Sequence, residues 1–544
     1  MASFETARDH FQAQRLPEAE HACRAALWAG IPSADLHALH GDILLAQQRP
    51  KESVAAYNEA IKIDPQCFAA WFGSGCAFLQ LQEFAASLES WRHALALHAT
   101  HVPSLHNYAK ALFQLGHIDA AIQHFHAAYE LDGNLHSLAA LATSIPANPA
   151  ATASDVLAAR QHYAATLPPP TPPKPTPHQG PIRIGYLSSF FQSDHWMKPV
   201  WGLLNHHDRT RFELFLLSDA PRSACTGYQQ HSSDHFLDIS ALSNDEAADR
   251  IEQLHLDLLV DLNGYSQLDR LPLVACKPAP IVVGWFNLYA TSGLPAYDFL
   301  IGDPHVVHPA EELHYSETVV RVPCSYLTFQ VQYPVPDVAP PPFLSNGHLT
   351  FGCFASHHKL NPNVLAAWAE ILRRAPNSRL LLKNSLLHRP TVLRHLLDAF
   401  EAHGIAPDRL SCSGRAPHFD FLAAYADVDI ALDPFPYNGG TTTMEALWQG
   451  VPVLCFDGDR WASRQGVSLL RNAGLPQFAA ADLPSYIETA VTLAQNPEPL
   501  VNLRANMRQH LQQSPVCDSA AFARQMEDLY LRMLSQSRQA HPGV

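Results

Sequence analysis

A spacing of 34 residues recurs through the first quarter of the chain and limits its fold more than any other feature. The spacing separates Gly41, Gly75 and Ala109. The same interval relates three other sets: small residues at Ser53, Ser87 and Ala121, aromatic residues at Tyr57, Trp91 and Phe125, and alanines at Ala60, Ala94 and Ala128. Small residues let two helices approach closely, and rings fill the space between them, so the pattern predicts stacked helix pairs.

These markers and their period are typical of tetratricopeptide repeats, which we expect over residues 1–135. Such arrays form a superhelix whose concave face holds extended peptide, so we expect proteins or peptides as partners. Residues 136–165 depart from the period, as a capping segment does. The stretch LPPPTPPKPTPHQGP (167–181) predicts an extended, semi-rigid linker, so capping helices and linker together span 136–181.

Beyond the linker, short apolar runs alternate with helix-like stretches. The runs are IRIGYLSS (182–189), FELFLLS (212–218), LDLLVDLNG (256–264), LTFGCF (349–354), NSRLLLKN (377–384), RLSCSG (409–414), VDIALDP (428–434) and VPVLCFDG (451–458). Such alternation predicts parallel sheets covered by helices. A proline-rich break near 335–347 divides the region into two α/β lobes, 182–340 and 341–518. A last helix with a tail, 519–544, can pack on either lobe.

Charge and composition exclude several classes of protein. The net charge of -15 argues against a general nucleic-acid binder, which needs a basic face. The start has neither the basic nor the apolar region of a secretory signal, and no apolar run has the roughly 18 residues that span a bilayer. The ten cysteines form no C-x-x-C pair, and the 32 histidines form no H-E-x-x-H motif. We therefore expect a cytoplasmic protein without a membrane segment or a bound metal.

The stretch DPFPYNGGTTTMEALWQG (433–450) reads as a strand end, a glycine-rich loop and a helix with Glu445 in its first turn. A helix start carries unpaired N–H groups and partial positive charge, so Gly440 to Thr443 can bind a diphosphate. Glu445 can accept hydrogen bonds from ribose hydroxyls. The alternative is that Thr441 only caps the helix.

Two further loops follow strand ends. FGCFASHHKLNP (351–362) carries Lys359, whose charge can neutralise a departing phosphate. In the first lobe, GYLSSFFQSDHWMKP (185–199) carries His195, a candidate general base, and the carboxylates Asp194 and Asp261 are the alternatives. Ligands bind outside the carboxyl ends of strands in open α/β sheets, so the two lobes should enclose a cleft between anion-binding groups and a base. That arrangement suits a nucleotide-sugar transferase. The Asp-Gly-Asp at 457–459 is interpreted as a turn.

Several of these motifs together resemble the O-linked N-acetylglucosamine transferase family. They are the 34-residue repeats, GYLSSFF, VDLNGYS, APIVVGWFNLYATSG (279–293), CFASHHKLNP, ALDPFPYNGGTTTMEALWQGVPVL and WASRQG (461–466). The resemblance implies a two-lobed GT-B fold of two Rossmann-like domains. It also implies UDP-N-acetylglucosamine as donor, Ser or Thr hydroxyls of proteins as acceptors, inversion at the anomeric carbon and no metal.

By this resemblance, Lys359 matches a lysine that contacts the diphosphate. Thr441 and Thr442 match phosphate-binding threonines, and Glu445 an acidic ribose ligand. Ala416 and His418 fall where the family holds uracil, and Ala290, Thr291 and Gly293 fall near the donor sugar. Ser356 replaces a glutamine that contacts the nucleotide, and Gly440 replaces a histidine of animal members. In an ungapped match Asp194 takes the place of the family's histidine, with His195 beside it, so the base stays open.

Other functions remain as alternatives. A retaining transferase acting on lipid or glycan often has two glutamates eight positions apart here, but Tyr437 stands eight before Glu445. A transferase of another sugar or acceptor is a second alternative. A repeat scaffold that binds nucleotide but transfers little or nothing is the third.

Overall fold

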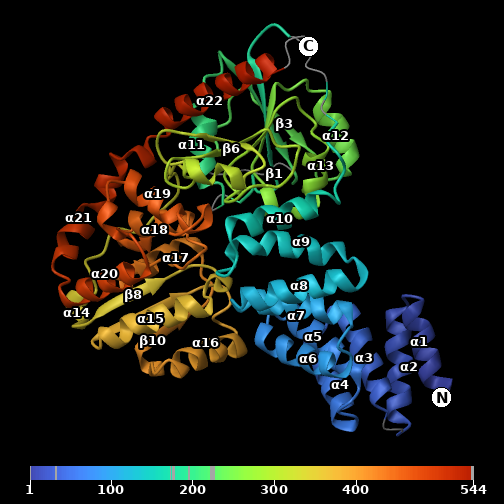
Figure 1. Ribbon diagram of the computed structural model, residues 1–544. Helices are drawn as coiled ribbons and strands as arrows, with labels where there is room; N and C mark the ends of the chain where they lie inside the picture. Colours follow the sequence, from blue (N-terminus) through green and yellow to red (C-terminus); the bar gives the residue numbers. More distant parts are fainter. Residues whose placement is uncertain are drawn as a thin grey trace.

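The structure is a computed structural model that describes residues 2–30, 33–171, 173, 178–193, 196–220 and 227–540. Along the chain it consists of a helical array, a first α/β lobe and a second α/β lobe (Figure 1). The array lies beside both lobes rather than extending away from them, and only its first helices stand clear.

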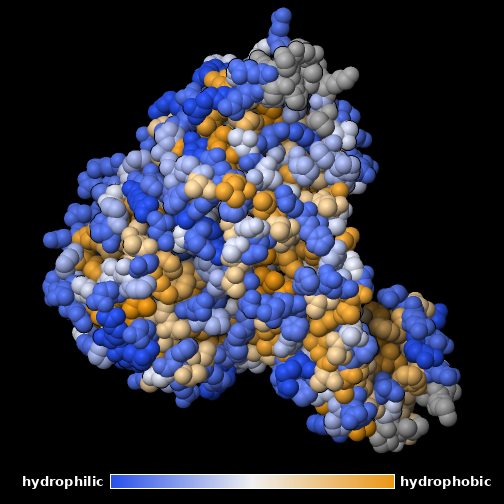
Figure 2. Space-filling model, in the orientation of Figure 1, coloured by the Kyte–Doolittle hydropathy of each residue, from blue (hydrophilic) through white to orange (hydrophobic). Residues whose placement is uncertain are grey.

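The array is built from antiparallel helix pairs, as the repeat predicts. Its helices are α1 (Ala2–Gln12), α2 (Leu16–Trp28), α3 (Ala34–Ala46), α4 (Pro50–Ile63), α5 (Phe68–Gln80), α6 (Phe84–Leu97), α7 (Val102–Gln114) and α8 (Ile118–Asp132). The Tyr57 and Trp91 rings are fully buried. A Cβ atom at Gly75 would lie 2.4 Å from the Trp91 indole nitrogen, so each repeat needs a small residue where the ring of the next helix fits. In the face shown by Figure 2, hydrophobic residues are visible along this array and where it meets the lobes.

Two further helices, α9 (Leu135–Ser144) and α10 (Ala153–Ala164), close the array against the first lobe. Arg160 of α10 is buried and joins the two parts. Its guanidinium donates to the carbonyl oxygens of Ala142 and Thr291, at 3.1 and 2.6 Å, and lies 3.9 Å above the Tyr265 ring. The array is therefore fixed to the lobe by a buried cation. Much of the predicted linker, residues 172 and 174–177, lies outside the described residues.

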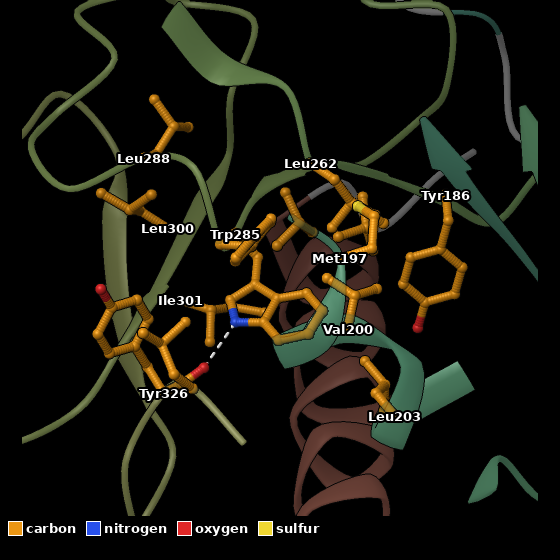
Figure 3. Packing of buried hydrophobic residues seen from close by; sticks show 14 of the residues in the cluster. Tyr186, Met197, Val200, Leu203, Leu262, Trp285, Leu288, Leu300, Ile301 and Tyr326 are labelled. Carbon is orange, nitrogen blue, oxygen red and sulfur yellow. Dashed lines mark hydrogen bonds between the residues drawn. The ribbon is translucent and has the colours of Figure 1, made fainter. Parts of the chain in front are cut away.

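The first lobe is a seven-stranded parallel sheet of order β3-β2-β1-β4-β5-β6-β7. Its strands are β1 (Ile182–Ser188), β2 (Phe212–Ser218), β3 (His235–Asp238), β4 (Leu258–Asp261), β5 (Val282–Gly284), β6 (Phe299–Gly302) and β7 (Thr318–Arg321). Helices α11 (Lys198–His206), α12 (Asn244–Glu252) and α13 (Leu271–Ala275) connect some of them. The core includes Trp285, whose indole N–H donates to the Tyr326 carbonyl at 2.9 Å (Figure 3).

The second lobe is a six-stranded parallel sheet of order β10-β9-β8-β11-β12-β13. Its strands are β8 (Leu349–Cys353), β9 (Ser378–Lys383), β10 (Leu410–Ser413), β11 (Ile430–Leu432), β12 (Val453–Phe456) and β13 (Ala479–Ala480). Its helices are α14 (Phe343–Asn346), α15 (Pro362–Arg374), α16 (Pro390–Ala402), α17 (His418–Ala423), α18 (Thr441–Trp448), α19 (Gln465–Asn472), α20 (Leu483–Gln495) and α21 (Pro499–Gln512).

The last helix, α22 (Ser519–Ala540), returns to the first lobe and packs on α11 (Figure 1). Buried polar groups hold it there. The His207 imidazole contacts Glu527 Oε1 at 3.0 Å and the Tyr186 hydroxyl at 2.6 Å, and Tyr186 contacts Tyr530 at 3.1 Å. The sequence left open which lobe this helix covers, and these contacts assign it to the first. Within the described part of the chain, no helix has the length and apolar character needed to cross a membrane.

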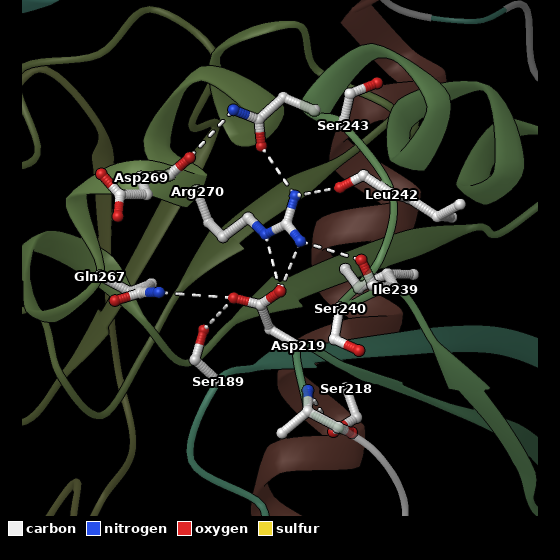
Figure 4. Close-up of polar contacts among 12 residues, drawn as sticks. Ser189, Ser218, Asp219, Ile239, Ser240, Leu242, Ser243, Gln267, Asp269 and Arg270 are labelled. Atoms are coloured by element: carbon white, nitrogen blue, oxygen red, sulfur yellow. Dashed lines mark hydrogen bonds and ion pairs between the residues drawn. The ribbon is translucent and has the colours of Figure 1, made fainter. Parts of the chain in front are cut away.

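The loop that follows β1 is held by a polar network at the carboxyl edge of the first sheet (Figure 4). Asp219 accepts hydrogen bonds from Arg270 Nε at 2.8 Å and from the Ser189 hydroxyl at 3.0 Å. Arg270 also donates to the backbone oxygens of Leu242 and Ile239. This network orders the start of the loop that leads to the site.

Candidate active site

A cavity of about 1030 Å³ lies between the carboxyl ends of the two sheets. Both lobes line it. The first lobe contributes Ser193, Trp196, Ser266, Phe286, Asn287, Tyr289 and Leu327; the second contributes Ser356, His358, Lys359, Arg415, Ala416, Pro417, His418, Phe421, Tyr437, Asn438, Gly440, Thr441, Thr442, Glu445 and Gln465. The cleft predicted from the sequence is thus present, and it brings together Ser356, Lys359, Ala416, His418, Gly440, Thr441, Thr442 and Glu445.

Lys359 sits in a 3₁₀ turn, His357–Lys359, between β8 and α15. Its ammonium donates to the Asn438 carbonyl at 2.7 Å and lies 3.8 Å from the centre of the Tyr437 ring. Burial holds the pKa of Lys359 below its ordinary value, and burial holds the pKa of the neighbouring Asp433 above its ordinary value. The lysine is therefore a desolvated cation whose charge acts strongly on an anion in the cavity.

Helix α18 begins at Thr441, directly beside Lys359's partner Asn438. Gly440, Thr441 and Thr442 line the cavity, whereas Thr443 is buried behind them. The helix starts three residues before Met444, so Glu445 lies one turn inside it rather than in the first turn. A Cβ atom at Gly440 would meet nothing closer than 3.6 Å, so there is room for an alanine methyl group at this position.

Glu445 is held by groups from both lobes. Lys198, at the start of α11 in the first lobe, forms a buried ion pair with Oε1 of Glu445. His418 Nε2 contacts the same oxygen at 2.8 Å and Lys198 Nζ at 3.0 Å. Burial would raise the pKa of Glu445, but the His418 hydrogen bond and the Lys198 charge hold it below the ordinary value. The carboxylate is therefore ionised and fixed in orientation.

Aromatic side chains from both lobes shape the cavity, among them Trp196, Tyr289 and Tyr437, and none of these three was predicted as a site residue. Tyr289 of the first lobe stacks on Tyr437 of the second, with ring centres 4.6 Å apart. Trp196 stacks on Phe190 and donates from its indole nitrogen to Asn287 at 3.2 Å. These contacts place a ring from each lobe at the meeting point of the two.

The segment Ala290, Thr291 and Gly293 does not line this cavity. It lies beneath α10, where Thr291 accepts from Arg160 and donates to Glu317 at 2.8 Å. A Cβ at Gly293, whose φ is +72°, would lie 2.7 Å from Arg160 atoms. The residues expected near the donor sugar are thus fixed by contact with the helical array, whereas Phe286, Asn287 and Tyr289, earlier in the same loop, line the cavity.

The three candidate bases have different outcomes. Asp194 and His195 lie outside the described residues, but Ser193 and Trp196 on either side of them line the cavity. Asp261 is fully buried and accepts from Tyr297 at 2.6 Å and from the backbone of Asn263 and Gly264. Burial raises the pKa of Asp261. It does not line the cavity, so the structure gives it a role in holding the loop after β4.

The acidic turn at 457–459 also has protein partners. Asp459 pairs with Arg460, and Asp457 pairs with Arg464 and Arg471. Within the described ranges, His, Cys, Asp and Glu side chains form no group of three placed to hold a metal ion. Metal independence stays a prediction.

Two facing parallel sheets with a cavity between their carboxyl ends form a two-lobed fold consistent with the GT-B type, and a lysine beside a helix start gives this cavity anion-binding groups. The chain belongs to glycosyl transferase family 41, whose model matches residues 166–338 and 342–526. Models of the tetratricopeptide repeat match residues 4–66, 38–102 and 102–135. The expected family and fold are confirmed.

Individual relatives agree with this assignment. The chain is 34% identical over 359 residues to a tomato (Solanum lycopersicum) protein described as a probable UDP-N-acetylglucosamine–peptide N-acetylglucosaminyltransferase SPINDLY. That match covers 65% of this chain but 39% of the tomato protein. The Caenorhabditis elegans UDP-N-acetylglucosamine–peptide N-acetylglucosaminyltransferase is 24% identical, over 66% of this chain and 41% of its own length. The chain thus spans about two fifths of these relatives.

A solved structure matches over nearly the whole chain. It is a mutant of the O-GlcNAc transferase from Thermobaculum terrenum, with 30% identity and a TM-score of 0.79. The match covers 93% of this chain and 98% of the bacterial one. The arrangement of repeats followed by two lobes is therefore shared with a known transferase.

Proposed function

We propose that this chain transfers N-acetylglucosamine from UDP-N-acetylglucosamine to Ser or Thr hydroxyls of proteins, with inversion and without a metal. The observation that carries the proposal is the grouping of Lys359, the start of α18 and Glu445 on one side of a cavity shared by both lobes. The names of the tomato and nematode relatives and of the bacterial structure support the donor and the acceptor class.

The anion-binding groups suit a nucleoside diphosphate. Lys359 supplies a full charge, and the N–H groups at the start of α18 supply partial charge and hydrogen bonds. Both would act most strongly as the bond from sugar to phosphate breaks, because negative charge then collects on the leaving diphosphate. No metal is needed in this arrangement if these groups carry the charge.

The nucleoside would lie toward Glu445. Among the described residues, the hydrogen bonds to this carboxylate use Oε1, and we assign Oε2 to the ribose hydroxyls. Ser356, Ala416 and His418 line the adjoining part of the cavity and would contact the uracil ring of the nucleotide.

The acceptor hydroxyl would enter from the first lobe. Inversion requires a base on the face of the sugar opposite the diphosphate. Lys359 and α18 belong to the second lobe, so we assign the base to the first-lobe segment that contains Asp194 and His195. The concave face of the helical array would bring the acceptor chain to this side.

One observation favours a second candidate. Lys198 and His418 already occupy one oxygen of Glu445, so protein groups satisfy part of the proposed nucleotide site. A scaffold that binds nucleotide but transfers little sugar, or a transferase with another donor or acceptor, would be compatible with that contact.

The test is incubation of the purified protein with labelled UDP-N-acetylglucosamine and a cell lysate, with and without EDTA. Label on protein that β-elimination releases, that persists in EDTA and that carries the β configuration supports the proposal. Labelled UDP-glucose in place of the first donor is the control for sugar choice. Bound UDP without labelled product would identify the scaffold.

A further inference from the structure

The outer face of the turn that carries Lys359 is covered by the helical array, not by the lobe itself. The α7 helix contacts this turn, and α6 contacts α16 next to it (Figure 1). Residues on both sides make this contact, among them Glu83, Phe113, Gly116 and His117 of the array and His358, Leu360, Thr391 and His395 of the second lobe.

Phe113 touches the residue next to Lys359. Its ring is stacked on the His358 imidazole, with centres 5.0 Å apart and planes 17° from parallel. His358 itself lines the cavity on its other side, where its ring is 6.1 Å from that of Tyr437. Burial lowers the pKa of His358 to about 3, so the imidazole is neutral and packs as an aromatic ring. Phe113 thus links the array to a residue of the cavity wall.

Gly116 holds the other end of the turn. Its φ is +85°, and a Cβ atom there would lie 2.5 Å from the Leu360 carbonyl oxygen and 3.2 Å from the Asn361 Cα. These are backbone atoms, which cannot rotate away as a side chain can. The backbone between α7 and α8 therefore lies directly against the residue that follows Lys359.

Polar contacts also hold the array in this position. His117 Nε2 and His395 Nε2 lie 3.1 Å apart, and the Thr391 hydroxyl donates to Glu83 at 2.5 Å. A buried cluster of Phe84, Leu115, Leu386 and Val392 fills the space between them. The contact is therefore packed and hydrogen-bonded rather than a loose approach.

We infer that Phe113 and Gly116 are positioning residues for Lys359, so that the repeat formed by α7 and α8 is part of the donor-binding apparatus. The inference rests on the proposed function, in which Lys359 binds the diphosphate. In this arrangement the repeats have a second role besides holding an acceptor: they set the position of the lysine through His358 and Leu360.

The experiment compares two glycine variants by calorimetric titration with UDP. Gly116→Ala introduces a Cβ at a positive φ and pushes on Leu360. Gly133→Ala introduces one at a φ of +72° with no atom within 4 Å, so it imposes similar backbone strain without the contact. We expect Gly116→Ala to raise the UDP Kd about tenfold or more, because small misplacements of a binding group are costly, and Gly133→Ala to change it less than about twofold.

A second set of variants tests the Phe113 ring. Phe113→Leu should also weaken UDP binding. Phe113→Tyr should leave UDP binding close to that of the unaltered protein, because its ring can still stack on the His358 imidazole. Tyr108→Leu is the matched control, since Tyr108 lies on the same helix but contacts His124 within the array. Binding is compared at temperatures where each variant is fully folded by circular dichroism, which separates affinity from stability.

Amide hydrogen exchange of residues 356–361 provides a readout that needs no ligand. Faster exchange there in Gly116→Ala, but not in Gly133→Ala, supports the inference. Unchanged exchange and unchanged UDP affinity in both Gly116→Ala and Phe113→Leu would overturn it, even if Lys359→Met abolishes binding. If the unaltered protein does not bind UDP, the proposed function fails; the inference then also fails as a statement about donor binding, whatever the exchange shows.

Discussion

Lys198 and Glu445 form a buried ion pair that joins the two lobes across 247 residues of sequence. The lysine begins α11 of the first lobe, and the carboxylate lies one turn inside α18 of the second. The pair makes the proposed ribose ligand depend on the lobes being together. Breaking a buried pair from one side leaves an uncompensated charge, which is the costly case.

We therefore expect Lys198→Met and Glu445→Leu each to lower the free energy of unfolding by about 3–5 kcal/mol. The double variant should be less destabilised than the sum of the two, because neither charge remains. Urea unfolding of the four proteins measures this coupling. Strict additivity would show that the pair contributes no coupling to stability.

The threonines at the start of α18 should differ in their effect on nucleotide binding. Thr441→Val and Thr442→Val remove hydroxyls that face the cavity, and each should raise the UDP Kd by about two- to tenfold, the value of one hydrogen bond. Thr443→Val serves as the control. It removes the same hydroxyl from the next residue, which is buried and does not line the cavity. Equal effects at all three positions in calorimetry would contradict a diphosphate at the helix start.

UDP binding should weaken as the pH rises above neutrality. Burial lowers the pKa of Lys359, so the free protein loses this charge at a lower pH than an ordinary lysine does. Bound diphosphate favours the charged form, so binding at about pH 9 should take up a proton. Calorimetry in buffers of different ionisation enthalpy measures the uptake, and Lys359→Met should abolish it. An affinity independent of pH between about 7 and 9 would exclude a titrating lysine at the diphosphate.

Arg160 should anchor the array to the first lobe. Arg160→Met leaves the Ala142 and Thr291 carbonyl oxygens without their donor, at a cost of about 1–3 kcal/mol each. The control is Arg373→Met, which removes an exposed pair with Glu370 and should cost less than about 1 kcal/mol. Denaturant unfolding compares the two, and equal losses would contradict the anchoring role.

The parts of the fold that could be predicted from the sequence are those whose contacting residues lie close together in the sequence. The repeats were predictable because the residues that pack on one another lie within one 34-residue period. Gly75 packs on Trp91, and Gly41 packs on Tyr57 in the same way. Strands β3, β5, β6 and β7 were not among the predicted runs. They are three or four residues long, and no long helix separates β5, β6 and β7, so the alternation of strand and helix is lost there.

The site residues also divide into those that local sequence predicts and those whose positions depend on distant parts of the chain. Lys359 and the start of α18 were predictable because a strand end, a loop and a helix start follow one another in the sequence. The Lys198 contact to Glu445 was not, since nothing near either residue indicates a partner in the other lobe. Packing decided the placement of Thr291 and Gly293, which Arg160 of the array holds away from the cavity.

The most direct test of the account is a structure of the protein crystallised with UDP. We predict density for the diphosphate between the Lys359 ammonium and the backbone N–H groups of Thr441 and Thr442, with the ribose hydroxyls at Glu445. Density for UDP elsewhere, or a diphosphate with no contact to Lys359 or α18, would contradict the proposed site.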